Sequence, residues 1–165
     1  MSERPEVIKV GIADLNIVKA PNSIRTSGLG SCVGAVIYDP ALQLAGMVHV
    51  MLPNSELAKG SEKLNRAKFA DTGIQQLFEL LVKNGAQPSR MKAKIAGGAQ
   101  MFQFSSSEHL RIGPRNTEAV KEQLKKLSIA VIAEDTGGNS GRTIQFDPAT
   151  CMLSIRTVNR GMSSL

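Results

Sequence analysis

The chain has 165 residues, of which 42% are hydrophobic and 21% charged, and its formal net charge is +6. This composition is typical of a globular protein with one hydrophobic core and argues against a disordered or fibrous chain. No apolar run is long enough to cross a bilayer, and residues 1–10 lack the apolar segment of a secretory signal. We therefore expect one domain over residues 1–165, located in the cytoplasm and not inserted in a membrane.

The two cysteines, Cys32 and Cys151, are too few for a disulfide framework and show no CxxC spacing. We predict free thiols in a reducing compartment, with no metal site and no dithiol redox centre. The positive charge favours an acidic partner. The basic residues are scattered and aromatic residues make up only 4% of the chain, so a platform for nucleic acid is not expected.

The first half of the chain predicts strands followed by a long helix. Alternating apolar residues at 8–12 indicate an opening strand, and the apolar, β-branched residues 33–38 indicate a buried one. The turn sequence Asp-Pro-Ala at 39–41 separates the buried strand from a returning strand over 44–52. Residues 61–84 follow a helical pattern, whose apolar stripe consists of Ala67, Ala70, Ile74, Leu77, Phe78 and Leu81.

The second half predicts a second helix between further strands. A short strand is expected around 93–96, and Asn116 or Thr117 could cap a helix with the apolar stripe Val120, Leu124 and Leu127. The remaining expected elements are a strand at 129–133, a Gly-rich loop at 135–141 and a hairpin of 142–146 with 152–158. Two helices among about seven strands predict an α/β (α+β) layered domain with mixed sheets.

Cys32 lies where a Gly-Leu-Gly-Ser loop meets the buried strand. Glycines allow a sharp bend and leave backbone N–H groups free, and N–H groups beside a nucleophile can form an oxyanion hole. Ser27, Gly28, Gly30 and Ser31 are the candidate loop residues. Taken alone, a cysteine at a buried strand is more often a small packing residue than a nucleophile.

His49, in the returning strand, is a candidate partner for Cys32. If residues 39–42 form a two-residue turn, Cys32 pairs with His49 on one side of the hairpin, with Cβ atoms roughly 5 Å apart. A slip of one residue would turn His49 to the opposite face, whereas a slip of two would keep the pair as diagonal neighbours. A histidine satisfied by backbone groups in the core is the alternative.

A cysteine–histidine pair has a chemical use. An imidazolium lowers the pKa of a nearby thiol, and the histidine can then protonate a leaving group and activate water. Thr26, Ser27 and Ser31 are near enough in sequence to hold the ring. Such a pair suits peptidases, acyltransferases and deamidases alike, so the reaction class stays open at this point.

Five ordered segments resemble the CheD family of chemoreceptor glutamine deamidases. They are TSGLGSCVG at 26–34, GMVHVMLP at 46–53, IAGGAQMF at 95–102, IGPRN at 112–116 and EDTGGNSGR at 134–142. The likeness covers nearly the whole chain, and five motifs in order are far more specific than any one. A mild departure is Cys151, where family members often carry glycine.

The resemblance implies a three-layer sandwich similar to the catalytic domains of deamidating toxins such as cytotoxic necrotizing factor. It implies catalytic roles for Cys32, His49 and Thr26 in hydrolysing glutamine amides of methyl-accepting chemotaxis receptors. It also implies binding to a CheC-type phosphatase, and no metal or organic cofactor.

Two further residues, Phe102 and Arg115, are candidates for contact with a partner or substrate, although core packing is the more common role for a phenylalanine such as Phe102. Two rival functions stay open. One is another cysteine enzyme, such as a peptidase or a transglutaminase-like acyltransferase. The other is a non-catalytic module that docks to the phosphatase and the receptor.

Overall fold

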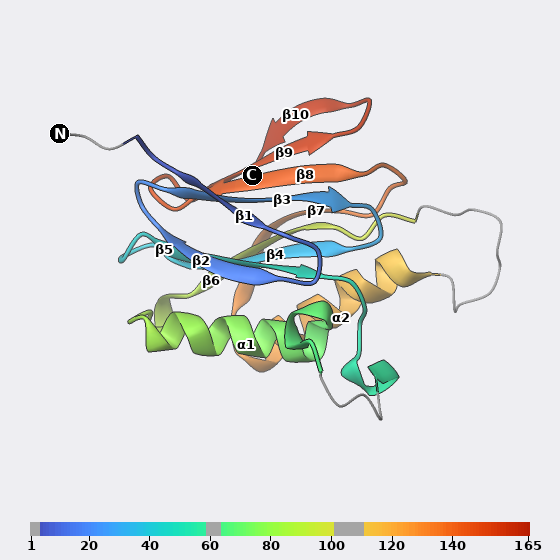
Figure 1. Cartoon of the computed structure of the whole chain (residues 1–165), viewed down its shortest axis with the longest axis horizontal. Coiled ribbons are helices and arrows are strands. Elements are labelled where there is room, and N and C mark those ends of the chain that lie inside the picture. The colour runs from blue at the N-terminus through green and yellow to red at the C-terminus, as the bar shows by residue number, and fades with distance from the viewer. Residues whose placement is uncertain (1–3, 59–63, 101–110) are drawn as a thin grey trace.

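The computed structural model describes residues 4–58, 64–100 and 111–165, which form two five-stranded sheets and two α-helices (Figure 1). The outer sheet has the order β1-β3-β8-β9-β10, and the central sheet has the order β2-β5-β4-β6-β7. The outer sheet consists of β1 (Val7–Val10), β3 (Ser23–Leu29), β8 (Arg142–Asp147), β9 (Met152–Thr157) and β10 (Gly161–Ser164). The central sheet consists of β2 (Leu15–Lys19), β5 (Leu44–Val50), β4 (Val33–Asp39), β6 (Lys92–Gly97) and β7 (Ala130–Thr136).

The helices α1 (Ala70–Lys83) and α2 (Ile112–Lys126) pack on one face of the central sheet, and the outer sheet covers its other face (Figure 1). Three short 3₁₀ turns complete the described elements: Ser55–Ala58, Arg66–Lys68 and Pro88–Arg90. Both sheets mix parallel and antiparallel pairs. The predicted three-layer α+β architecture with mixed sheets is therefore confirmed.

The central strands β4 and β5 are buried at every residue. A sheet covered on both faces needs apolar side chains on both, which explains the nearly continuous apolar runs at 33–38 and 44–50. Side chains of Val33, Ala35 and Val48 face the helices, whereas those of Val36 and Met47 face the outer sheet. The protein therefore has two cores, and the interface between the sheets is the one that holds the site described below.

The hairpin of β4 and β5 has a different register from the predicted one. Asp39 pairs with Leu44, so four residues form the turn, and His49 pairs with Gly34 rather than with Cys32. The Asp39 carboxylate accepts hydrogen bonds from the Ala41 and Gln87 N–H groups and a bidentate pair from Arg90 at 2.8–2.9 Å. Gln87 and Arg90 lie outside the hairpin, so they stabilise a turn that cannot be predicted from the turn residues alone. The shift is two residues, so Cys32 and His49 remain on one face as diagonal neighbours.

Both helices begin at other residues than predicted. Helix α1 begins at Ala70, because Met51 and Leu52 N–H bind the Lys68 carbonyl and hold the preceding segment against the end of β5. Helix α2 begins at Ile112, so neither Asn116 nor Thr117 is its cap, and Asn116 lies on the buried face. The predicted stripe is otherwise confirmed, since Val120 and Leu124 are fully buried.

Strand β3 is not among the strands predicted from the sequence. Its residues alternate between buried Ile24 and Thr26 and exposed Arg25 and Ser27, so one face carries polar side chains that hide the strand pattern. It pairs in parallel with β1 and antiparallel with β8. The predicted hairpin of 142–146 with 152–158 is confirmed as β8 and β9.

Candidate active site

Thr26 and His49 meet across the interface between the two sheets. Thr26 is on β3 of the outer sheet, His49 is on β5 of the central sheet, and 2.7 Å separates Thr26 Oγ1 from His49 Nδ1. Both residues are buried, with exposed fractions of 2% and 0%. A residue placed by sequence in a loop before Cys32 is thus held against the histidine by the stacking of two sheets.

The direction of this hydrogen bond follows from the other partner of Thr26. Its hydroxyl donates to the Val10 carbonyl oxygen at 2.8 Å. A hydroxyl has a single proton, so toward His49 its oxygen can only accept, and Nδ1 must carry the hydrogen. The neutral imidazole then has an unprotonated Nε2, which is buried and has no hydrogen-bond partner among the described residues. This nitrogen can therefore accept a proton.

Gly34 lies directly opposite His49 on β4, under the side chains of the outer sheet. A Cβ added there would come within 2.6 Å of Ile144 Cδ1 and 3.2 Å of Leu29 Cδ1. A larger residue would therefore require these side-chain ends to shift, and glycine lets the outer sheet pack closely beside the histidine.

Cys32 lies immediately before β4 and is partly buried against the core between the sheets. Side chains two residues apart on a strand share a face, so Cys32 lies on the same side as Gly34 and its partner His49. The structure brings Cys32, His49 and Thr26 to one end of the sheet interface, although no direct contact between the thiol and the ring is present among the described hydrogen bonds.

The thiol and the imidazole are both in a neutral state near pH 7. Burial raises the pKa of the Cys32 thiol, an effect partly offset by its own backbone N–H. Burial also lowers the pKa of His49 to about 4. Desolvation disfavours the charged form of either group. Burial therefore favours a neutral thiol beside a neutral imidazole over a thiolate–imidazolium pair.

The loop before Cys32 is fastened to the loop after β6. Gly98 N–H donates to the Cys32 carbonyl, and Ala99 N–H donates to the Gly30 carbonyl, each at 2.9 Å. A Cβ on Gly97, whose φ is 112°, would overlap the Cys32 carbonyl oxygen. Gly97 and Gly98 therefore lie close to the backbone of the Cys32 loop.

Asn116 joins this loop to the histidine strand, and our sequence reasoning missed it. Its Nδ2 donates to the carbonyls of Ser31 at 3.0 Å and Met51 at 2.8 Å, and its side chain is fully buried. Asn116 precedes Val120 by four residues, so it belongs to the buried stripe of α2. An asparagine within an apolar helical stripe is the signal that could have revealed it.

Arg142, also unassigned by sequence, connects the neighbouring loops. It is largely buried, and its guanidinium donates to the carbonyls of Gly97 at 3.2 Å and Gly137 at 2.9 Å and to Asp135 Oδ1 at 3.4 Å. The Gly-rich segment 134–142 thus supports the loop that contacts Cys32. No cluster of metal-ligating side chains occurs within residues 4–58, 64–100 and 111–165.

The remaining predicted residues lie apart from this cluster or outside the described chain. Arg115 is exposed on α2 and Ser27 is exposed on β3, whereas Phe102 falls within 101–110, outside the described residues. Cys151 is half-buried with a φ of 59°, a left-handed conformation that favours glycine. That conformation agrees with the glycine often found at this position in the family it resembles.

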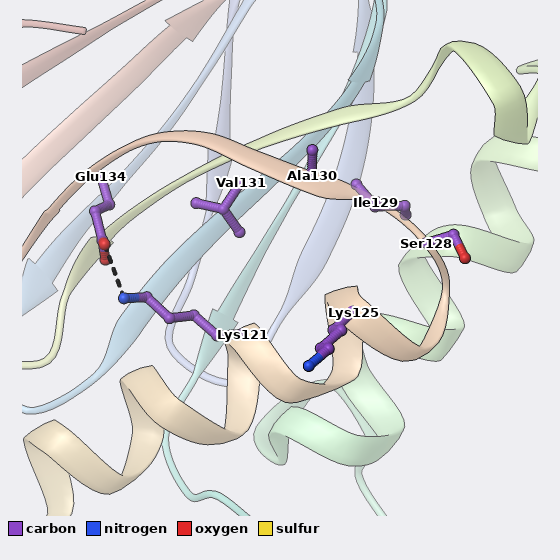
Figure 2. A pocket seen from close by; sticks show the side chains of 7 residues that line it. All are labelled: Lys121, Lys125, Ser128, Ile129, Ala130, Val131 and Glu134. Carbon is purple, nitrogen blue, oxygen red and sulfur yellow. Dashed lines mark hydrogen bonds and ion pairs between the residues drawn. The ribbon is translucent and has the colours of Figure 1, made fainter.

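A hollow of about 520 Å³ lies between α2 and β7 (Figure 2). Lys121 and Glu134 on its wall form an ion pair, with 2.7 Å between Nζ and Oε1. Its lining includes neither a cysteine nor a histidine. We therefore place the candidate chemistry at the sheet interface and not in this hollow.

The fold and the site define a class: a three-layer α+β protein with a thiol and a threonine-oriented histidine between its two sheets. A family model described as "CheD chemotactic sensory transduction" matches residues 51–157. The chain is 57% identical over 160 residues to "Chemoreceptor glutamine deamidase CheD" of Bacillus subtilis (strain 168), covering 96% of each. It is 57% identical over 157 residues to the protein of that name from Halalkalibacterium halodurans, covering 94% of this chain and 96% of the other. This chain belongs to the CheD family.

A comparison with solved structures supports the fold. The Bacillus licheniformis hypothetical protein YfiH matches with a TM-score of 0.50 at 14% sequence identity, over 76% of this chain and 51% of that chain. At this identity the match speaks for the architecture alone. None of the described helices has both the length and the apolar character that a membrane span requires.

Proposed function

We propose that this chain is a cytoplasmic, single-domain enzyme that converts glutamine side chains of chemoreceptors to glutamate, with Cys32 as the nucleophile. Two observations support the proposal. The relatives that match over nearly the full length are named chemoreceptor glutamine deamidases. The unprotonated Nε2 of His49 lies on the same face of the sheet as the Cys32 thiol.

The first step is attack on the amide. His49 Nε2 takes the thiol proton while the Cys32 sulfur forms a bond to the glutamine Cδ, and the carbonyl oxygen becomes an oxyanion. The Cys32 N–H already lies beside its own sulfur, where it favours negative charge, and it is the nearest candidate donor to the oxyanion. Thr26 accepts from Nδ1–H throughout, so the ring keeps its tautomer and orientation.

The second and third steps release the products. The imidazolium gives its proton to the amide nitrogen, the C–N bond breaks, and ammonia leaves a thioester on Cys32. Neutral His49 then takes a proton from water, the hydroxyl adds to the thioester carbon, and the thiol leaves with the proton held by the ring. The products are glutamate and the free enzyme, so atoms and charge balance without a cofactor.

The neutral resting state constrains this sequence of steps. A histidine with a pKa near 4 is unprotonated at cytoplasmic pH, but it is a weak base toward a thiol whose pKa is raised by burial, so the thiol proton has to move while the C–S bond forms. The imidazolium that it becomes is destabilised by burial, which makes it a strong acid toward the departing amine. Activation therefore depends on proton transfer during attack rather than on a standing thiolate.

Mass spectrometry of a receptor fragment tests the reaction. Each converted glutamine adds about 1 Da, whereas peptidase activity gives fragments and acyl transfer adds the mass of the amine less that of the released ammonia. The Cys32→Ala variant should add nothing, and the Cys151→Ser variant should match the wild type. Conversion at the wild-type rate by Cys32→Ala would exclude Cys32 as the nucleophile.

We also propose that the chain binds a CheC-type phosphatase. The proposal rests on the family, and it is compatible with catalysis because binding needs no reaction. A pull-down of the phosphatase by the inactive Cys32→Ala variant should succeed as well as with the wild type. Failure of both proteins to bind would reject this second role and leave the deamidase proposal intact.

A further inference from the structure

Two basic side chains lie next to each other on the outer sheet close to the candidate site. Lys9 on β1 and Arg25 on β3 are register partners in a parallel pair of strands. The neighbouring partners Val10 and Thr26 are both buried toward the central sheet, so Lys9 and Arg25 point to the opposite face. Both Lys9 and Arg25 are exposed.

This face of the outer sheet is open. Both helices pack on the far side of the central sheet, and in Figure 1 no described helix lies against the outer face of β1 and β3. Neither Lys9 nor Arg25 has an ion-pair partner among the described carboxylates. Like charges placed opposite each other in a sheet repel, so the pair costs stability unless an anion joins it.

Both residues help to line a recess of about 240 Å³ on β1 and β3. Its lining consists of Lys9, Val10, Arg25, Thr26 and Ser27. A water molecule occupies about 30 Å³ in the liquid, so the recess can hold a carboxylate side chain with room for hydration. Two of its lining residues belong to the site itself, since Val10 and Thr26 form the hydrogen-bond chain that orients His49.

We propose that this recess binds an acidic side chain of the protein substrate, close to the glutamine that enters the site. The inference rests on the proposed deamidase function and adds a determinant of which glutamines are selected. A lysine and an arginine together offer up to eight N–H donors, and charge-assisted bonds to a carboxylate are among the stronger hydrogen bonds. The formal net charge of +6 would attract the same acidic surface over a longer range.

Charge reversal at the recess, compared with equal reversal elsewhere, tests the proposal. Lys9→Glu/Arg25→Glu is compared with Lys83→Glu/Lys125→Glu, whose lysines are exposed on α1 and α2 in the helical layer. Each double variant lowers the formal net charge from +6 to +2. The recess variant should raise KM for a receptor fragment about tenfold or more relative to the matched variant, with kcat little changed.

Two additional measurements make the result decisive. Alkylation of Cys32 by iodoacetamide should proceed at the wild-type rate in the recess variant, which shows that the site is folded; a Lys9→Gln/Arg25→Gln variant serves if it does not. Replacing acidic receptor residues beside a converted glutamine by alanine should raise KM for the wild type and have little further effect on the recess variant. This non-additivity identifies the ligand as a carboxylate.

The failures are distinguishable. If the wild type adds no mass to the receptor, the proposed function is wrong, and the inference falls with it. If the wild type converts glutamine but the two double variants share one KM, or if the receptor and enzyme substitutions simply add, the inference alone is overturned.

Discussion

The hydrogen bond of 2.7 Å between Thr26 Oγ1 and His49 Nδ1 joins the two sheets of the sandwich. It lies in the interface between them, where water is excluded, and the second partner of Thr26, the Val10 carbonyl, determines its direction. The relationship therefore links the packing of the sheets to the protonation state of the histidine. Any change that separates the sheets locally should therefore also change the orientation and the pKa of His49.

Replacing Thr26 tests this relationship. Thr26→Val keeps the shape but leaves Nδ1–H buried without an acceptor, which should cost about 1–3 kcal/mol in the free energy of unfolding. Loss of ring orientation should lower kcat about a hundredfold, a typical cost for a misplaced catalytic group. Thr26→Ser retains the hydroxyl and should keep most of the activity. Receptor deamidation and urea unfolding measure both effects, and equal activity in the valine and serine variants would contradict the assignment.

Stability should depend on pH through His49. Its pKa is about 4 in the folded protein and about 6.5 when unfolded, so between these values the unfolded chain binds a proton that the folded protein does not. The free energy of unfolding should therefore fall as pH drops from 6.5 toward 4, by roughly 3 kcal/mol in total. Urea unfolding at several pH values measures this slope. In His49→Gln the part of the slope due to this residue should vanish, and an unchanged slope would refute the explanation.

Reactivity of Cys32 should report a neutral thiol. Because burial raises its pKa, the rate of alkylation by iodoacetamide should keep rising through the alkaline range without a plateau near neutrality. Mass spectrometry of quenched samples of the Cys151→Ser variant gives the alkylation rate of Cys32 alone at each pH. A plateau between pH 5 and 8 would instead show a standing thiolate–imidazolium pair.

Asn116 should position the Cys32 loop. In Asn116→Leu the carbonyls of Ser31 and Met51 lose their shared donor, and in Asn116→Asp a carboxylate oxygen would face them. We expect both variants to lower kcat more than they raise KM, with the aspartate variant less stable because a charge would be buried. The rate of Cys32 alkylation should also differ from that of the wild type, because the loop that holds the thiol would shift. Unaltered kcat in a folded Asn116→Leu protein would leave Asn116 with a packing role alone.

Gly97→Ala should displace the Cys32 loop. The new Cβ would overlap the Cys32 carbonyl oxygen, and a φ of 112° is itself unfavourable for alanine. We expect a loss of stability of about 1–3 kcal/mol and a lower rate of receptor deamidation. Gly11→Ala is the matched control, because nothing lies within 4 Å of its added Cβ. Wild-type activity in Gly97→Ala would show that the loop tolerates the shift.

The layered fold was largely predictable from local patterns. The apolar runs at 33–38 and 44–52, the helical stripe ending at Leu81 and the final hairpin each reflect burial that is encoded within a short stretch of chain. Cys32 and His49 became candidates because glycines precede the one and the other interrupts an apolar strand. The predicted register was wrong, but Cys32 and His49 still lie on one face of the sheet, because a shift of two residues leaves each side chain on its original face.

Other features depend on contacts between distant segments. The hairpin register follows from Asp39 bound by Arg90, the strand character of β3 from pairing with β1 and β8, and the role of Asn116 from two carbonyls far away in sequence. By itself, the sequence determined which residues are apolar, which can bend and which can react. Only the tertiary structure decided the tautomer of His49 and the neutrality of the thiol, because both depend on burial and on hydrogen bonds that exist only when the sheets are stacked.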